Sequence, residues 1–167
     1  GAFATSYIPT VASQVTRTAD NATIQGSNFY SWYNQNEGTL YAERDNETTT
    51  GIRPLASFFT TGTPLNYMAF YRSAGVTSLE MVTNGAINAS IQITSAAKAA
   101  FSYATNNTNM SVGGTLGTTD TSCAIPFSAF FEIGSIYNGV YKTNGTIKKL
   151  AYYNTRLSNS TLQSITS

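Results

Sequence analysis

Residues 67–93 read YMAFYRSAGVTSLEMVTNGAINASIQI, and this stretch decides the fold class. Short runs rich in Val, Ile, Tyr, Phe and Thr are separated by residues that favour turns, above all Asn84-Gly85. Such runs are typical of strands, because β-branched and aromatic side chains fit a pleated surface. The stretch therefore predicts consecutive antiparallel strands over 67–72, 77–82 and 86–93.

The register of the last two strands depends on the turn that joins them. A two-residue Asn84-Gly85 turn would pair Met81 with Asn88, which mixes apolar and polar side chains on one face. A three-residue loop over 83–85 would pair Met81 with Ile87, and a glycine can adopt the left-handed conformation that such a bulge requires. We therefore predict a bulged hairpin.

The same pattern continues along the chain, whereas helical periodicity appears only near residues 95–101 and at the C-terminus. Ser158 is placed to cap a short helix over 159–165, and Leu157 and Leu162 stand at the positions of a hydrophobic staple. This many short strands predicts an all-β fold, a two-sheet antiparallel β-sandwich with a short C-terminal helix. The remaining predicted strands are 15–18, 38–45, 55–59, 99–104, 109–112, 130–133 and 146–153.

Length and composition restrict the class of partner. The 167 residues suit a single domain spanning 1–167, which can bury a core without disulfides or metal. Only 10% of the residues are charged, about a third are Ser, Thr or Asn, and the formal net charge is +1. A surface of this kind suits a polysaccharide or oligosaccharide, and it offers no basic field for nucleic acid or anionic lipid. The sequence contains no apolar run of 18 residues, so membrane insertion is not expected.

Cysteine and histidine usage restricts the chemistry further. Cys123 is the single cysteine, and its apolar surroundings indicate a small buried side chain. Histidine is absent, which disfavours Ser-His, Cys-His and His-zinc sites together. A chain that begins Gly-Ala-Phe without Met is expected to be a segment of a longer protein.

Segments in the N-terminal quarter and near the C-terminus carry a family resemblance. The segments are ATSYIPT (4–10), VTRTAD (15–20), NFYSWYN (28–34), EGTL (37–40), GTIKKLAYY (145–153) and RLS (156–158). In this order they resemble the concanavalin A-like, laminin-G-type jelly-roll domains of bacteriophage tail fibres and tailspikes. The resemblance implies two packed antiparallel sheets and attachment to a polysaccharide on the host surface. It also implies a place in the virion tail, outside the host cell, within a parent protein that is often a homotrimer.

Laminin-G-type domains can bind calcium, for which carboxylate groups are the usual side-chain ligands. Asp20, Asp45 and Asp120 are scattered, and no EF-hand-like loop of oxygen ligands occurs. We predict no metal and no other cofactor.

The acidic triplet Glu43, Asp45 and Glu47 is the catalytic-looking pattern of the chain. Carboxylates at i, i+2 and i+4 of a strand share one face, and a similar triplet serves retaining β-glucanases of jelly-roll architecture. The intervening residues Arg44 and Asn46 are polar, however, and a threonine-rich tract follows. We therefore interpret the triplet as a solvated strand end in which Arg44 balances the acids.

Aromatic residues in loops are the candidate sugar-binding groups, because flat rings stack on the C–H faces of pyranoses. Most rings of the chain belong to strand-like runs and are expected in the core, as is Trp32. One candidate site lies in a loop-like segment and comprises Tyr137, Asn138, Tyr141, Lys142 and Asn144. A second comprises Tyr67, Tyr71 and Arg72, where alternation places both tyrosines on one face; packing against the neighbouring sheet is the alternative.

Three functional hypotheses follow from these observations. The first is a non-catalytic carbohydrate-binding module of a phage tail protein. The second is a jelly-roll glycoside hydrolase that uses Glu43 and Glu47. The third is a purely structural or trimerisation domain of a virion protein.

Overall fold

The computed structural model describes residues 22–45, 51–60, 65–136 and 139–167. Predictions that fall on 15–18, on Glu47, on Tyr137 and on Asn138 lie outside these ranges. The elements are β1 (Thr23–Gln25), α1 (Ser27–Tyr30), β2 (Glu37–Arg44), β3 (Ile52–Phe59), β4 (Tyr67–Ser73), β5 (Val76–Thr83), β6 (Ala86–Thr94), β7 (Lys98–Ala104), β8 (Asn109–Val112), β9 (Thr115–Leu116), β10 (Phe130–Ile133), β11 (Ser135–Ile136), β12 (Tyr141–Lys142), β13 (Ile147–Tyr153) and α2 (Asn159–Thr166).

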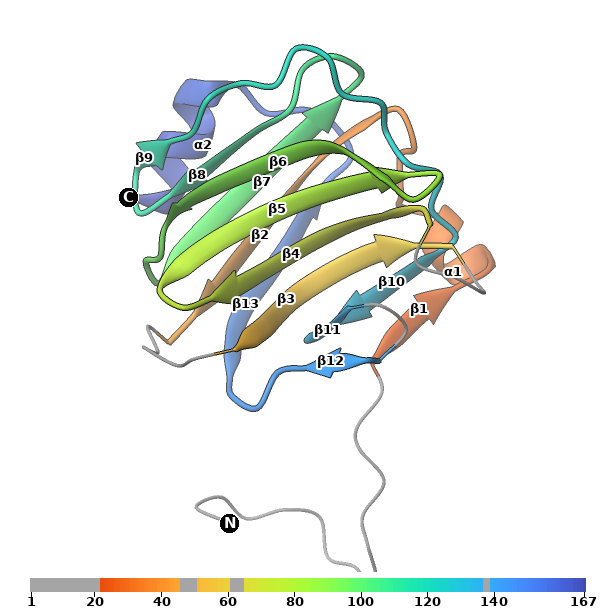
Figure 1. Ribbon diagram of the computed structural model, residues 1–167, viewed down its shortest axis with the longest axis horizontal. Coiled ribbons are helices and arrows are strands. Elements are labelled where there is room, and N and C mark those ends of the chain that lie inside the picture. The colour runs from red at the N-terminus through yellow and green to blue at the C-terminus, as the bar shows by residue number, and fades with distance from the viewer. Residues whose placement is uncertain (1–21, 46–50, 61–64, 137–138) are drawn as a thin grey trace, which may run out of the picture.

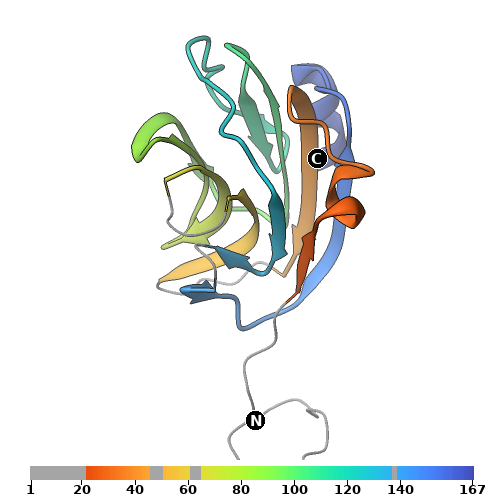
Figure 2. The ribbon, with the colours of Figure 1, turned by 90° about the vertical axis from the view of Figure 1, so that its right-hand side faces the viewer.

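Two antiparallel sheets form the sandwich (Figures 1 and 2). One sheet has six strands in the order β1-β10-β3-β4-β5-β6, and the other has five in the order β13-β2-β7-β8-β9. Figure 2 shows them as two layers, with β3 to β6 in one and β2 and β13 in the other. A small β11-β12 hairpin lies against β3 of the six-stranded sheet. The predicted all-β sandwich with a C-terminal helix is confirmed.

Most predicted strands agree with the structure within a few residues, and 109–112 and 130–133 agree at both ends. The helical periodicity near 95–101 was misleading, because this stretch enters strand β7. The short elements β1, α1, β9, β11 and β12 were not predicted. Two-residue and three-residue strands carry too little alternation to be recognised, since pairing with a longer neighbour defines them.

The register of the β5-β6 hairpin differs from the prediction. Thr83 pairs with Ala86, so Asn84-Gly85 forms a two-residue turn, and both of its residues have positive φ (52° and 78°). The register then shifts by one residue in β6, and beyond the shift Met81 pairs with Ala89. The apolar faces do match, as expected, but the extra residue sits in β6 and not in the turn. Asn and Gly adopt the positive φ angles of a two-residue turn readily, so the turn keeps two residues and the bulge lies in β6.

Aromatic and aliphatic side chains from both sheets fill the space between the layers. Phe70 of β4 meets Phe101 of β7 edge to face, with ring centroids 5.2 Å apart, and both are fully buried. Phe58 of β3 packs on Phe131 of β10 at 4.7 Å. Trp32 is partly buried against this core, as predicted. Each fully buried aromatic side chain contributes about 2–3 kcal/mol of hydrophobic free energy.

A tyrosine cluster closes one end of this core around Gly38 of β2. The Tyr103 hydroxyl donates to the Asn34 carbonyl (2.7 Å) and lies 2.9 Å from the Tyr152 hydroxyl. The Tyr152 hydroxyl also accepts from the Asn34 backbone N–H (3.0 Å). Burial raises the pKa of Tyr33 to about 12 and raises that of Tyr103 further, so these phenols remain hydrogen-bond donors at neutral pH. The cluster ties the α1 turn to β7 and β13.

Helix α2 covers the side of the five-stranded sheet that is turned away from the core. The Ser158 hydroxyl accepts from the Thr161 N–H (3.1 Å), which confirms the predicted N-cap. Leu162 is fully buried and packs with Tyr41 of β2, and Leu157 joins the same cluster. The Thr166 hydroxyl lies 2.8 Å from the Ser111 hydroxyl, which fixes the end of the helix to β8.

Cys123 is fully buried, as predicted, with its Sγ atom 3.0 Å from the Thr108 hydroxyl oxygen. Within the described ranges, no helix combines the length and the apolar character needed to cross a membrane.

The β11-β12 hairpin covers Glu132 of β10, whose side chain lies on the face of the six-stranded sheet that is turned away from the core. Glu132 is 2% exposed, and its Oε2 atom has no hydrogen-bond partner among the described residues. Burial raises the pKa of this carboxyl, while the Gly139 backbone N–H and the charge of Lys142 partly offset that effect.

The packing around Gly38 predicts a steric limit. A Cβ atom at this position would lie 2.6 Å from the Tyr103 hydroxyl and 2.7 Å from the Tyr152 hydroxyl. Gly38→Ala is expected to lower the free energy of unfolding by about 1–3 kcal/mol, because the tyrosines must leave their hydrogen bonds. Urea denaturation measures this loss. Ser90→Ala at an exposed position of β6 is the control, with a change within about 0.5 kcal/mol; equal effects of the two variants would contradict the prediction.

Glu132 predicts a pH dependence of stability. Because its pKa is raised in the folded state, the folded protein binds this proton more tightly than the unfolded chain does. The free energy of unfolding should therefore rise as the pH falls from neutrality toward the ordinary carboxyl pKa of 4.5. Glu132→Gln removes this dependence and should gain about 1 kcal/mol at pH 7, because the cost of burying the charge is only partly offset by Gly139 and Lys142.

Denaturation across this pH range compares wild type with Glu132→Gln. Asp45→Asn is the control, since Asp45 is about half exposed in its ion pair with Lys148 (2.6 Å) and should change stability little. A Glu132→Gln protein less stable than wild type at pH 7 would show that the buried charge is well compensated.

Candidate functional site

Alternation along β4 gives the six-stranded sheet two chemically different faces. Met68 and Phe70 point into the core, whereas Tyr67 and Tyr71 point to the opposite side, which we call the outer face. Tyr67 is 8% exposed and Tyr71 is partly exposed. The two tyrosines therefore share a face, and it is the face turned away from the second sheet.

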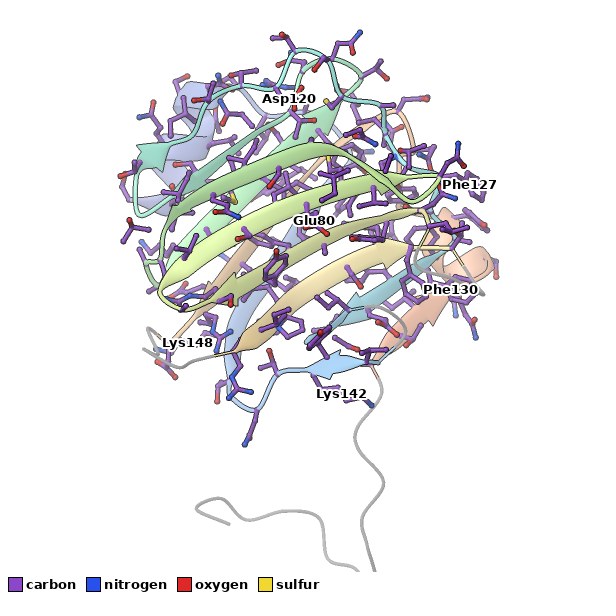
Figure 3. The ribbon with its side chains drawn as sticks, viewed as in Figure 1. Glu80, Asp120, Phe127, Phe130, Lys142 and Lys148 are labelled. Carbon is purple, nitrogen blue, oxygen red and sulfur yellow. The ribbon has the colours of Figure 1, made fainter. Side chains whose placement is uncertain are left out.

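Polar side chains of β5 and β6 continue this outer face. Ala69 pairs with Glu80, and Glu80 pairs with Ser90. Two residues further along β4, Tyr71 pairs with Ser78, and Ser78 pairs with Gln92. Figure 3 shows Glu80 near the middle of this face. Ser90 and Gln92 are exposed, so the β5-β6 side of the face is open to solvent.

A hydrogen bond fixes the carboxylate of Glu80. The Tyr67 hydroxyl donates to Glu80 Oε1, and Tyr67 is held in turn by the apolar cluster around Ile136. Burial raises the pKa of Tyr71, and the negative charge of Glu80 acts in the same direction. Tyr71 therefore presents a protonated phenol beside a carboxylate, so one donor and one acceptor lie close together.

The β11-β12 hairpin borders the open part of this face. The Ser57 hydroxyl of β3 donates to the Ser135 carbonyl (3.1 Å), and Ile136 is fully buried against the outer-face cluster. Tyr141 pairs with Ile136 and so lies on the side of the hairpin that packs on the sheet. Its ring is 40% exposed. The exposed Lys142 stands at the lower margin of the sheet (Figure 3).

The two predicted sites thus border one another, because Tyr141 and Lys142 belong to the hairpin that covers part of the face carrying Tyr67 and Tyr71. Asn144 lies beyond the hairpin, where it lines a cavity of about 400 Å³ together with Lys142, Thr143 and Gly145. Tyr137 and Asn138 lie outside the described residues.

Arg72 is separated from the tyrosines. It is 5% exposed, and its Nη1 atom donates to the Asp45 carbonyl (3.1 Å) at the end of β2. Alternation turns it toward the core side of the sheet, where it connects the two layers. Its position is therefore structural, and it does not contribute to the outer face.

The acidic triplet divides between different surroundings. Glu43 accepts a hydrogen bond from the Tyr41 hydroxyl (3.2 Å) on the side of the five-stranded sheet that is turned away from the core. Asp45 pairs with Lys148. Arg44 between them is 2% exposed. Within the described part of the chain, Glu43 and Asp45 thus engage neighbouring side chains at a strand end. A paired acid and nucleophile would need two carboxyl groups facing one substrate cleft.

Within the described ranges, no three His, Cys, Asp or Glu side chains lie close enough together to share a metal ion. The Asp120 carboxylate accepts from the Ser122 N–H (2.8 Å) and hydroxyl (3.1 Å) within its own loop.

Glu80, Ser90 and Gln92 were not predicted as site residues. The alternation of β4 and β5 was visible in the sequence, but the position of Ser90 beside Glu80 depends on the bulge in β6. In the predicted register, β6 is displaced by two residues relative to β5, so Ser90 does not lie opposite Glu80.

In chemical terms the outer face is a polar platform whose charged group on β4 to β6 is the carboxylate of Glu80, as far as the described residues show. The partly exposed rings of Tyr71 and Tyr141 offer apolar contact, and the serine, glutamine and tyrosine groups offer hydrogen bonds. Among the described outer-face residues of β4 to β6 there is no cationic side chain. Ligands with many hydroxyl groups match this arrangement, because a carboxylate accepts from them while phenol and amide groups donate.

No protein-family model matches the chain, and no curated protein is similar to it in sequence. Solved structures with a similar fold include the CBM40 carbohydrate-binding module of a Ruminococcus gnavus sialidase, bound to α2,3-sialyllactose. It is 20% identical, with a TM-score of 0.68 over 80% of this chain and 84% of that one.

Two further neighbours belong to larger proteins. NanB sialidase of Streptococcus pneumoniae is 13% identical, with a TM-score of 0.66 over 87% of this chain and 26% of that one. A structure of botulinum neurotoxin type C, described as depending on two ganglioside molecules for cell entry, is 10% identical. Its TM-score is 0.61 over 87% of this chain and 40% of that one. At these identities the comparisons establish the fold, which is a lectin-like jelly-roll β-sandwich.

Proposed function

We propose that the chain is a non-catalytic carbohydrate-binding module whose binding surface is the outer face of the six-stranded sheet, bordered by Tyr141. The observation that carries this proposal is the composition of that face. Partly exposed rings of Tyr71 and Tyr141 lie on the β3-β4 side of a row of hydrogen-bonding groups that includes Glu80 on β5 and Gln92 on β6. The similarity of the fold to carbohydrate-binding modules supports the same class of ligand.

The charge of the face favours a neutral sugar. A sialic acid carries a carboxylate, which needs a cationic or multiply donating partner in a partly desolvated site. Here Glu80 occupies the middle of the face, and Lys142 stands at the lower margin of the sheet (Figure 3). Like charges in such a site repel, so the ligand class differs from the sialyllactose of the Ruminococcus gnavus module.

The biological setting is a further part of the proposal. The sequence resemblance supports a module of a bacteriophage tail fibre or tailspike, located in the virion tail and facing the polysaccharide of the host surface. A shallow polar face gains little net free energy from each hydrogen bond, so a single site binds weakly. A homotrimeric parent protein would present three copies, and avidity would strengthen attachment by about 10²–10⁴.

Binding to immobilised polysaccharides tests this function. The chain, displayed both as a monomer and on a trimeric carrier, is applied to an array of neutral bacterial polysaccharides and to 3′-sialyllactose. We expect retention on at least one neutral polymer, much stronger for the trimer, and none on sialyllactose. Binding to sialyllactose alone, or to nothing on an array that covers the surface polysaccharides of the host, would contradict the proposal.

Substitutions locate the surface. Tyr141→Ser and Gln92→Ala should each weaken monomer binding by about 3-fold to 10-fold, because a stacking ring or an amide donor contributes about 0.5–1.5 kcal/mol. Tyr30→Ser on α1 is the matched control, since Tyr30 is 53% exposed and α1 contacts β1, at the opposite edge of the sheet from β6. Unchanged binding in both face variants, with native thermal stability, would place the site elsewhere.

A further inference from the structure

A second hollow lies at the edge of the five-stranded sheet, next to α1. It has a volume of about 450 Å³ and is lined by Ser31, Trp32, Tyr152, Tyr153, Asn154 and Thr155. This volume falls within the range of about 300–1,000 Å³ that is usual for small-molecule sites. None of the lining residues is charged. We call this hollow the edge pocket.

The aromatic wall of the edge pocket is rigid. Trp32 meets the ring of Tyr152 edge to face at 4.9 Å and the ring of Phe131 at 5.5 Å. The Asn34 side-chain amide donates to the Asn154 carbonyl (2.9 Å), which fixes the chain where β13 ends. A ligand would therefore meet a wall that is already ordered, at little cost in conformational entropy.

The polar rim of the pocket is available to a ligand. Tyr153 is 42% exposed, and Asn154 and Thr155 are also exposed. Within the described part of the chain, the side-chain amide of Asn154 and the hydroxyl of Thr155 make no hydrogen bond to protein. Ser31 donates its hydroxyl to the Asn28 carbonyl (3.1 Å), so its oxygen can still accept. Donors and acceptors thus surround an aromatic wall.

From this combination we infer that the edge pocket is a second carbohydrate site, which takes one uncharged sugar residue. An aromatic wall contacts the apolar C–H face of a pyranose, while an amide and hydroxyls on the rim bind its hydroxyl groups. A charged ligand would find no counter-ion among the lining residues. The class of ligand agrees with the proposed function, but the residues are different, so the two sites can be tested separately.

The two sites belong to different layers of the sandwich. The outer face is built on β4, β5 and β6, whereas the edge pocket is built on the residues that follow α1 and on the end of β13, at the border of the other sheet. Two sites on one module allow it to hold a polysaccharide at two points, which raises the effective affinity for a long chain without new contacts at either site.

Trp32 makes the edge pocket observable, because it is the single tryptophan of the chain and lines the pocket. Its fluorescence is followed while the intact chain is titrated with maltose, cellobiose, lactose and N-acetyllactosamine, with 3′-sialyllactose as the anionic comparison. We expect a saturable change with at least one neutral disaccharide and a dissociation constant of about 1 mM, which is typical of a single shallow site.

Variants separate this site from the outer face. Tyr153→Ser and Asn154→Ala should each weaken the Trp32 response at least 5-fold, whereas Tyr141→Ser, a tyrosine of similar exposure on the hairpin, should leave it unchanged. Circular dichroism confirms that each variant is folded. The inference is overturned if no neutral sugar of this panel changes the Trp32 signal up to tens of millimolar, or if the response persists in both pocket variants. Failure of the outer-face site shows itself differently, as polysaccharide binding that is unchanged in Tyr141→Ser and Gln92→Ala or absent altogether.

Discussion

The alternation of β4 between two chemically different faces is the constraint on which the rest of the structure depends. Every second residue, above all Phe70, must be buried against the five-stranded sheet, where it meets Phe101. The intervening side chains, Tyr67 and Tyr71 among them, then point to the opposite side of the sheet, away from the core. A shift of one residue in this strand would exchange the core and the outer face together. Stability of the core and chemistry of the surface are therefore set by the same register.

The outer face is itself divided by the β11-β12 hairpin. Over β10 and β3 the hairpin buries Ile136 and Glu132, so this part belongs to a second small core. Over β5 and β6 no such cover exists in the described residues, and Ser90 and Gln92 remain in solvent. The boundary between the two parts runs beside Tyr71 and Tyr141. A ligand surface at such a boundary combines firm support from beneath with access from one side.

Much of the fold was predictable from the sequence because it follows from local patterns. The strands with clear alternation, the cap at Ser158 and the burial of Cys123 were all found, since each depends on near neighbours in the chain. The register of β5 and β6 was wrong, because two signals competed: a favourable Asn-Gly turn and the matching of apolar faces. The structure satisfies both by placing a bulge in β6. A prediction that assumes one constant register on both sides of the turn does not include a bulge within β6.

The candidate site was harder to predict for the same reason. The sequence predicts that Tyr67 and Tyr71 share one face of a strand and that Tyr141 lies in a loop-like segment. That the two candidate sites border one another follows from strand pairing and from the docking of a distant hairpin. Arg72 looked like a ligand-binding cation, but alternation buries it between the layers. Glu80 was overlooked because a lone carboxylate in a strand has no signature until its partner, the Tyr67 hydroxyl, is known. Sites assembled across strands depend on contacts that are remote in sequence.

The position of Cys123 has a practical consequence. Its sulfur is sealed from solvent beside Thr108, so thiol reagents reach it only when the sandwich opens. The rate at which a chromogenic disulfide reacts with the native protein then measures how often the structure around Cys123 opens. Below the melting temperature, an artificial cysteine introduced at the surface would take a dye or a spin label without competition from the natural one.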